Sequence, residues 1–411
     1  MSFQQALSGL NAAAKNLDVI GNNVANTATV GFKAGQAQFT DVYAAALSGG
    51  GGSEVGIGTK LASVAQQFTQ GNVTATNNPL DVAINGNGFF QIDTNGVLGY
   101  TRNGQFQIDR DEYLVTSDGG RVQGYPVTNG VTGGTPGDVQ LSTTILAPSA
   151  TTAASISLNL DSRASSLSSA AFNYADATTY TSSTSMTLYD SLGNSHVYSM
   201  YFLKTGSNTW NSYATLTNSA GSTVNLSSAG PLNTISFNSA GAISSGASTT
   251  QTITSAQLGT GAADLTNMGL SFAGSTQYGS SFGVNSLSQD GYAPGRLTGY
   301  SIGSDGMVKA RYSNGQAVNT AQLVLGAFAN PQGLQPLGNN LFAETNASNQ
   351  VTLGVPGSGK LGLLQASAVE ESNVDLTAEL VSMITAQRNY QANSQTIKTQ
   401  DQILQTLVNL R

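Results

Sequence analysis

The 411-residue sequence contains no cysteine, one histidine and one tryptophan, and only 9% of its residues are charged. Without cysteine the chain can form neither a disulfide nor a thiolate metal site, and one histidine is a poor basis for a zinc site or a Ser-His-Asp triad. The net charge of −7 argues against nucleic acid or an anionic membrane as a partner. No run approaches the ~18 apolar residues of a membrane span. The first residues lack the pattern of a secretory signal peptide.

Small and polar uncharged residues take the place of the missing charges. The chain has 48 glycines and is rich in serine, threonine, asparagine and glutamine. Its hydrophobic fraction of 39% is still sufficient for β-sheet cores, so disorder of the whole chain is not expected. At about 150 residues per domain, the length predicts two to four domains.

The longest regular pattern lies at the C-terminus, in residues 372–411. Neither proline nor glycine interrupts it, and Ser372 and Asp375 have the spacing of a capping box, with Asp375 itself a good N-cap. This pattern predicts a helix of about 35 residues and about 50 Å. Positions four and three residues apart form a heptad-like seam that is apolar at both ends and polar in the middle: Leu376, Leu380, Met383, Gln387, Tyr390, Ser394, Ile397, Asp401, Leu404 and Val408.

A second amphipathic helix is predicted over residues 1–26, where Ser2 and Gln5 have capping-box spacing. The same stepping selects a second seam: Phe3, Leu7, Leu10, Ala14, Leu17, Gly21 and Val24. The two helices can form an antiparallel pair within one domain, or they can complete their packing against other copies of the chain. Polar and small residues in both seams favour the second interpretation. The predicted subunit-packing residues are Phe3, Leu7, Leu10, Leu17, Val24, Leu376, Leu380, Met383, Tyr390, Ile397, Leu404 and Val408.

Between the helices the patterns are those of β-strands. Leu80, Val82 and Ile84 alternate before the turn signal Asn85-Gly86, and further turn signals stand at Asn95-Gly96 and Asp305-Gly306. Within 148–285, a region rich in serine and threonine, strands are predicted at 156–160, 185–189, 197–202 and 210–216. Their aromatic residues argue against a disordered spacer. A Gly/Ser run at 48–53 predicts a flexible loop.

Three motifs are candidates for a chemical site. Residues 354–361 spell G-x-x-x-x-G-K followed by Leu361, so the hydroxyl that would hold Mg²⁺ is missing, and a Gly-rich loop is the better interpretation. His196 has no partner set for catalysis, and the acidic group Asp109, Asp111 and Glu112 matches no calcium-loop spacing. We therefore predict no catalytic, cofactor-binding or metal-binding residues and no enzymatic activity.

The terminal segments carry a family resemblance. Residues 8–33, SGLNAAAKNLDVIGNNVANTATVGFK, and 383–404, MITAQRNYQANSQTIKTQDQIL, resemble the terminal signatures of bacterial flagellar rod and hook proteins, with hook proteins the most similar. The segments NPLDVAINGNGFFQI and YTRNGQF extend the resemblance. It implies a multidomain α+β protein, in which long terminal helices form a coiled-coil-like inner domain and all-β outer domains are nested by chain insertion.

Four nested domains are expected on this basis. They are an inner helical polymerisation domain (1–29 and 372–411), a linker region (30–70 and 358–371), a discontinuous β domain (71–147 and 286–357) and an inserted outer β domain (148–285).

The resemblance also implies a function: a subunit that assembles into the curved, hollow hook, a universal joint that transmits torque from rod to filament. The implied partners are other hook subunits, the distal rod protein, the hook cap, the hook-filament junction protein and the type III export apparatus, which would export the chain without cleavage to the cell surface. Two alternatives stay open. One is a distal rod protein of the same family, and the other is a secreted β-rich protein that binds glycans or adheres.

Overall fold

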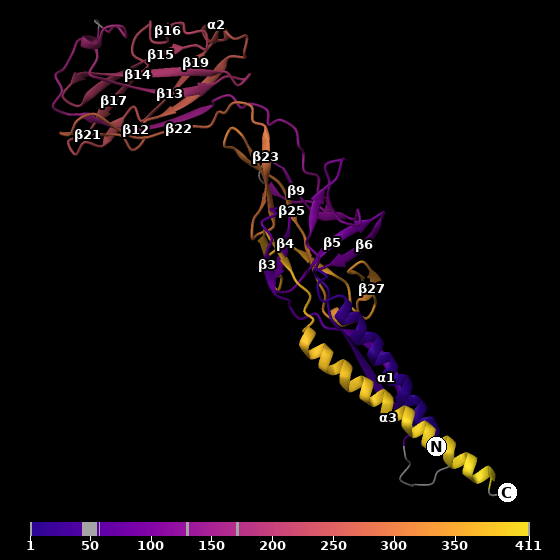
Figure 1. The fold of residues 1–411 in the computed structure, drawn as a ribbon. Coiled ribbons are helices and arrows are strands. Elements are labelled where there is room, and N and C mark those ends of the chain that lie inside the picture. The colour runs from indigo at the N-terminus through magenta and orange to yellow at the C-terminus, as the bar shows by residue number, and fades with distance from the viewer. Residues whose placement is uncertain (1, 43–55, 57, 129–130, 170–171, 410–411) are drawn as a thin grey trace. The chain divides into compact units, whose positions relative to one another are not determined.

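The computed structural model describes residues 2–42, 56, 58–128, 131–169 and 172–409. The chain divides into two compact units, and each is built from segments that are not continuous in sequence. Unit 1 comprises Met1–Thr143, Gly299–Arg311 and Ala317–Arg411, and unit 2 comprises Thr144–Thr298 and Tyr312–Gln316. The structure is mostly β, with one long helix near each terminus (Figure 1). Neither of these helices, nor any other in the described ranges, is long and apolar enough to cross a bilayer.

The two terminal helices lie side by side and antiparallel in unit 1 (Figure 1). They are α1 (Ser2–Ala25) and α3 (Leu376–Asn409). As predicted, Asp375 caps α3, because its carboxylate accepts hydrogen bonds from the backbone N–H groups of Thr377 (2.9 Å) and Ala378 (3.1 Å). Ser372 lies outside the helix. In α1 the side-chain amide of Gln5 donates to the carbonyl of Gly56, 2.6 Å away, and so ties the helix to the following hairpin.

That hairpin consists of β1 (Gly35–Val42) and β2 (Gly58–Gln66), which pair antiparallel and pack against α1. Both strands lie within residues 30–70, which were expected to belong to a linker region. The Gly/Ser run at 48–53 lies outside the described residues.

The remainder of unit 1 is a β body. Its largest sheet, in the described residues, follows the path β23-β24-β25-β9-β5-β6-β28-β27, with shorter strands attached, and β3-β31 and β4-β30 form two small sheets. Phe89, Tyr100, Phe328, Leu334 and Phe342 form a buried cluster in this body. The strands are β3 (Val73–Ala75), β4 (Val82–Asn85), β5 (Phe89–Thr94), β6 (Val97–Thr101), β7 (Phe106–Ile108), β8 (Leu114–Thr116), β9 (Arg121–Thr128), β10 (Val131–Thr132), β11 (Gly137–Asp138), β23 (Leu297–Ile302), β24 (Met307–Tyr312), β25 (Ala317–Leu323), β26 (Leu325–Ala327), β27 (Gln335–Gly338), β28 (Leu341–Ala343), β29 (Thr352–Gly354), β30 (Leu363–Ala366) and β31 (Ala368–Glu370), with a short 3₁₀ turn at Pro331–Gly333.

Of two Asn-Gly turn signals in the sequence, one closes a β-hairpin and the other does not. Asn95 and Gly96 have φ angles of 54° and 85° and join the paired strands β5 and β6, as a two-residue hairpin requires. Asn85-Gly86 closes no hairpin, because β4 pairs with β30 and β5 pairs with β6. Gly86 instead lets the returning chain approach: a Cβ at this position would lie 3.0 Å from the Cα of Gly362.

Unit 2 is a β-sandwich of two sheets that share one apolar core. Alternate residues of β12, such as Ile156 and Leu158, meet Phe202 and Trp210 from the opposite sheet, and all four are 0% exposed. In the described residues one sheet comprises β12 (Ala153–Asp161), β19 (Ser248–Ile253), β20 (Leu265–Ser271), β21 (Thr276–Tyr278) and β22 (Gly283–Gln289). The other comprises β13 (Ser182–Tyr189), β14 (Ser195–Gly206), β15 (Thr209–Thr217), β16 (Thr223–Asn225), β17 (Asn233–Phe237) and β18 (Ile243–Ser245). The connections include the 3₁₀ turn Ala177–Thr179 and helix α2 (Ser255–Leu258).

Candidate assembly surface on the terminal helices

The buried apolar residues of α1 and α3 are mostly alanines. On α1, Ala6, Ala13 and Ile20 recur every seven residues and are at most 8% exposed, and on α3 Ala386 is 2% exposed. The helices approach so closely that a Cβ at Gly9 would lie 2.8 Å from the side chain of Asn393. The buried line therefore differs from the seam of large apolar residues that the heptad stepping selects.

Six of the twelve predicted subunit-packing residues remain exposed. Phe3, Leu7, Leu376, Leu380, Tyr390 and Leu404 are between 38% and 55% exposed. Leu10, Leu17, Val24, Met383 and Ile397 are half-buried, and the side chain of Val408 lies outside the described part of the chain. Three further exposed apolar residues, Val381, Ile384 and Ile403, do not follow the predicted stepping, although Ile384 lies four residues after Leu380 and three after Val381, a helical spacing that is visible in the sequence.

The two helices differ in length, and α3 continues past the beginning of α1 (Figure 1). Because Gly9 lies beside Asn393 and the helices are antiparallel, the start of α1 lies level with about residue 400 of α3. The last part of α3 therefore has no α1 beside it, and Ile403 and Leu404 there are 48% and 55% exposed. Apolar residues on a long, unpaired helix end indicate a partner from outside the chain.

A groove follows α1 between α3 and the β1–β2 hairpin. It consists of cavities of about 440 and 470 Å³ that share Asn16 and Phe39 in their linings. Asparagine, alanine and glycine provide most of the other lining groups, so this groove offers small and polar contacts rather than a catalytic set.

Two asparagine side chains fasten the root of the helix pair. Asn23 of α1 donates to the carbonyl of Gly35 (2.8 Å) and to a carboxylate oxygen of Glu379 on α3 (3.0 Å). Asn373, which precedes α3, accepts from the N–H of Ala34 (2.7 Å) and donates to the carbonyl of Gln67 (2.6 Å). Each amide thus joins segments that are far apart in sequence.

A buried ion cluster lies beside these amides. The carboxylate of Glu370 accepts from Lys33 Nζ at 2.6 Å and from an Arg102 guanidinium nitrogen at 3.2 Å, and the three side chains are at most 4% exposed. Lys33 also donates to the carbonyl of Thr69 (2.7 Å), and Arg102 donates to that of Gly86 (2.8 Å). Burial lowers the pKa of Lys33 and of Arg102, and the charge of Glu370 opposes both shifts. Sequence reasoning missed this cluster, since no local pattern links Lys33 to Glu370.

Gly31 brings the chain into this cluster. Its φ is +71°, and an added Cβ would lie 2.6 Å from the backbone nitrogen of Asn103. Its N–H donates to the carbonyl of Glu370 at 2.7 Å. These contacts explain two residues of the segment Gly31-Phe32-Lys33. Position 31 requires glycine, and Lys33 places its ammonium group in the buried ion cluster.

The three candidate motifs for a chemical site lie in turns or in a buried hydrogen-bond network. Residues 354–361 form turns without a following helix, and Lys360 is exposed. Asp109 accepts hydrogen bonds from the N–H groups of Asp111 and Tyr113 within a tight turn. In the described residues no group of three His, Asp or Glu side chains could hold a metal ion.

His196 is a buried structural residue of unit 2. Its Nε2 lies 3.0 Å from Asp190 Oδ2, and both side chains are 0% exposed. Burial by itself raises the pKa of Asp190, but hydrogen bonds from Thr260, His196 and Asn194 outweigh it and hold that pKa below its ordinary value. These bonds organise the turn between β13 and β14 and its contact with the loop after α2.

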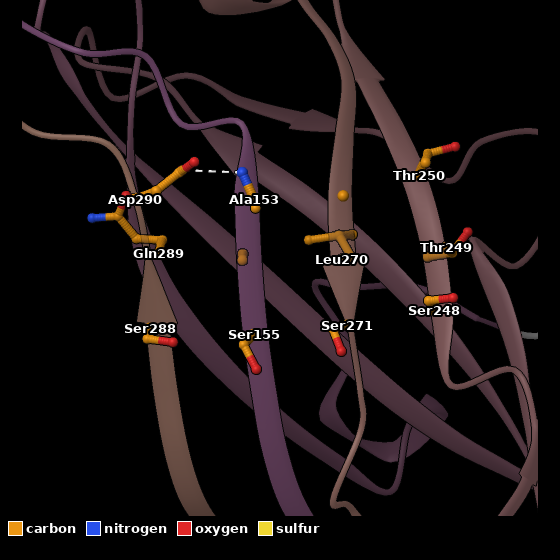
Figure 2. A pocket seen from close by; sticks show the side chains of 12 residues that line it. Ala153, Ser155, Ser248, Thr249, Thr250, Leu270, Ser271, Ser288, Gln289 and Asp290 are labelled. Carbon is orange, nitrogen blue, oxygen red and sulfur yellow. Dashed lines mark hydrogen bonds between the residues drawn. The ribbon is translucent and has the colours of Figure 1, made fainter. Parts of the chain in front are cut away.

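Unit 2 also contains an open cavity of about 820 Å³ on the five-stranded sheet (Figure 2). Half of its twelve lining residues carry hydroxyl groups, among them Ser155, Ser248 and Ser271, although most of the lining surface is apolar. Its carboxylate, Asp290, accepts hydrogen bonds from the N–H groups of Thr152 and Ala153, the second of which is drawn in Figure 2. The carboxylate of Asp290 is thus already hydrogen-bonded to the backbone, and no cation or aromatic ring lines the cavity. The lining therefore resembles an open sheet face rather than a ligand site.

Comparison with protein families finds four matches along the chain. They are the flagella basal body rod protein (residues 3–33), the flagellar hook protein FlgE/F/G D1 domain (83–161), the flagellar basal body protein FlaE D2 domain (159–292) and the flagellar basal body rod FlgEFG protein C-terminal region (365–410). The two terminal matches cover the helices, and the two central ones cover β segments.

Full-length relatives match as well. The flagellar hook protein FlgE of Salmonella typhimurium is 46% identical, with both chains covered completely, and that of Escherichia coli is 44% identical with the same coverage. FlgE of Borreliella burgdorferi is 32% identical over all of this chain and 99% of its own. The crystal structure of Helicobacter pylori flagellar hook protein FlgE2 shares the fold, with a TM-score of 0.55 and 16% identity over 72% of this chain and all of that one.

Proposed function

This chain belongs to the flagellar hook protein family, and from that membership we propose how its helices and β domains work in the hook. It is a structural subunit of the bacterial flagellar hook, and its family is one of structural proteins rather than enzymes. The observation that carries the proposed mechanism is the row of large apolar residues on α1 and α3 that the chain itself leaves exposed.

The proposed assembly uses these residues as contacts between copies. Burying a large apolar side chain is worth about 1.5–3 kcal/mol, so a few such contacts per copy outweigh the entropy lost on ordering the subunit. The two surfaces that meet between neighbouring copies differ from each other, because at one end of the helix pair α3 continues past α1 and at the other end both helices join the β body. Contacts between unlike surfaces generate an open helical polymer when the rotation closes no ring. The inner domain of that polymer, 1–29 and 372–411, would be coiled-coil-like and would line a hollow tube.

The β domains supply the mechanical behaviour in this proposal. The discontinuous domain of 71–147 and 286–357 adds contacts around the tube, and the inserted domain of 148–285 forms weaker polar contacts outside it. Hydrogen bonds between such surfaces contribute only about 0.5–1.5 kcal/mol each, so they can exchange while the tube turns. A curved tube of this construction transmits torque and bends cheaply, as a universal joint must.

The remaining partners follow from the place of a hook in the flagellum. One end would join the distal rod protein and the other the hook-filament junction protein, with a hook cap at the growing end. The subunit would reach the cell surface through the type III export apparatus without cleavage. No cofactor and no nucleic acid takes part.

The test is polymerisation of the purified full-length chain, followed by electron microscopy. Curved hollow tubes of one diameter are expected. Straight, stiff tubes would favour the distal rod alternative, although full-length identity to hook proteins speaks against it. Glycan binding by a chain that forms no polymer would overturn the proposal in favour of a secreted β-rich binding protein.

A further inference from the structure

Three separate passages of the chain meet where the terminal helices join the β body of unit 1. One passage leaves α1, a second leaves β2, and a third enters α3. The backbone itself ties them together, since Gly31 donates to Glu370 (2.7 Å), Gln67 donates to Ala34 (2.8 Å) and Glu371 donates to Asn72 (2.8 Å). The direction of the helix pair relative to the β body is therefore determined within this small region.

The charged side chains add directional bonds to the same region. Lys33 belongs to the passage from α1, Glu370 to the passage into α3, and Arg102 to the loop that follows β6. One oxygen of Glu370 accepts from Lys33 and from the N–H of Gly71 (2.9 Å), and the other accepts from Arg102. A shift of any one passage breaks at least one of these bonds.

Stability alone gives little reason for such a cluster. Taking three charges out of water costs about as much as their attraction returns, and well-packed apolar residues of similar volume are often equally stabilising. This cluster holds two cations and a single carboxylate, and Arg102 Nε is buried without a hydrogen-bond partner among the described residues. Polar bonds fix a geometry, because their distances and angles are restricted, whereas apolar packing does not.

Direction matters because the helices are long levers. The 34 residues of α3 extend about 50 Å at 1.5 Å per residue. A rotation of about 10° at the root moves the far end by roughly 9 Å, which is about the distance between two packed helices. A small change in the angle between the helix pair and the β body would therefore displace the exposed apolar residues by about the distance between two packed helices.

We propose that the Lys33–Glu370–Arg102 cluster is an orientation lock that fixes the direction of the terminal helix pair relative to the β body. The proposed function supplies the reason why direction matters, but the lock itself is a property of the single chain and is tested there.

The absence of cysteine allows a direct measurement with pairs of spin labels. One pair replaces Asn11 on α1 and Gln107 on β7, both exposed, and reports the direction of the helices. A control pair at Gln107 and Lys309 lies wholly within the β body. Pulsed electron paramagnetic resonance then gives the distance distribution of each pair in the isolated chain.

Two variants separate orientation from stability. Glu370→Gln removes the anion, and we expect a lower melting temperature and a broader Asn11–Gln107 distribution. The triple variant Lys33→Met, Arg102→Met, Glu370→Leu removes all the charges. We expect it to recover the parent melting temperature while its Asn11–Gln107 distribution stays at least twice as broad as that of the parent. The Gln107–Lys309 distribution should be narrow in every chain.

Three results would overturn the proposal: a broad distribution in the parent, a parent-like distribution in Glu370→Gln, or a parent-like distribution in the folded triple variant. Electron microscopy of polymers adds a second readout, in which the triple variant should give tubes of irregular diameter or none. If the parent also forms no tubes, the proposed function has failed, and the distance measurement still decides the lock.

Discussion

The sandwich of unit 2 and the terminal helix pair bury their apolar residues in different ways. In the sandwich, Ile156, Leu158, Phe202 and Trp210 are all 0% exposed. On the helices, most of the buried apolar residues are alanines, while residues as large as Phe3 and Leu404 are about half exposed. The sandwich therefore completes its core within one chain, whereas the helices leave large apolar residues exposed, which we propose are covered by partners.

This difference determines what a mutation reveals. A change in the sandwich core alters the stability of the single chain, and its effect is the same at any protein concentration. On the proposed assembly, a change on the exposed helix faces should alter association and leave the folded chain nearly unchanged. The only tryptophan, Trp210, lies in the sandwich core, so its fluorescence reports unit 2 alone.

The largest effect is expected from Leu404→Asp. A carboxylate buried without a partner costs several kcal/mol at each contact between copies, so we expect no polymer to form. Trp210 fluorescence and the β signal in circular dichroism should stay unchanged. Gln402→Asp, which adds the same charge at an exposed polar position two residues away, is the control and should polymerise. If Leu404→Asp forms normal tubes, Leu404 does not belong to the assembly surface.

Removing the inserted domain should change curvature rather than assembly. Leu146 and Gly295 exchange backbone hydrogen bonds of 2.9 and 3.2 Å, so a short Gly/Ser join can replace residues 147–294. We expect tubes that are straighter than those of the parent, because exchangeable contacts outside the helices are lost. Electron micrographs decide this, and either a complete loss of tubes or an unchanged curvature would contradict this role.

Within the sandwich, Leu158→Ala should lower the free energy of unfolding of unit 2 by about 2–5 kcal/mol, because it leaves a cavity in a closed core. Urea unfolding followed by Trp210 fluorescence measures the change. Leu287→Ala on the neighbouring strand β22, where the side chain is 37% exposed, should cost about 1 kcal/mol. Equal losses at the two positions would show that the sandwich core is less complete than the structure indicates.

At the root of the helices, Gly31→Ala should destabilise unit 1 by about 2–3 kcal/mol, since it combines a left-handed φ with a steric clash. Gly96→Ala shares the positive φ, but nothing lies within 4 Å of the added Cβ, so it should cost about 1 kcal/mol. Thermal unfolding followed by the helical circular dichroism signal compares them. A smaller loss at Gly31 than at Gly96 would contradict the close approach to Asn103.

The smallest effect is a pH dependence in unit 2. The pKa of Asp190 is lowered from its ordinary value of 3.8, so its ionised form stabilises the folded state above that pH. This contribution is lost as the pH falls from about 4 toward the folded-state pKa. In Asp190→Asn the decline of melting temperature below pH 4 should be shallower. An equally steep decline would assign the acid sensitivity to other carboxylates.

Much of this architecture could be predicted from local patterns. Alternating Ile156, Leu158 and Leu160 gave a strand, and Asp375 gave the start of α3, because both signals act over a few residues. The internal helix contact could not be predicted, since the stepping ranks Phe3 and Leu7 above Ala6 and Ala13, and only close packing makes alanine the better contact. Lys33 and Glu370 meet across 337 positions, a distance over which no spacing rule applies.

The paired backbones of Leu146 and Gly295 have a consequence for evolution. A chain that leaves and returns at adjacent points can gain, lose or exchange the whole segment between them in one genetic event, and the path of the remaining residues does not change. Such sites allow members of a family to differ in length while their ends stay alike. The alignment with the Borreliella burgdorferi protein spans 452 positions against 411 residues here, so the two chains differ in length by insertions.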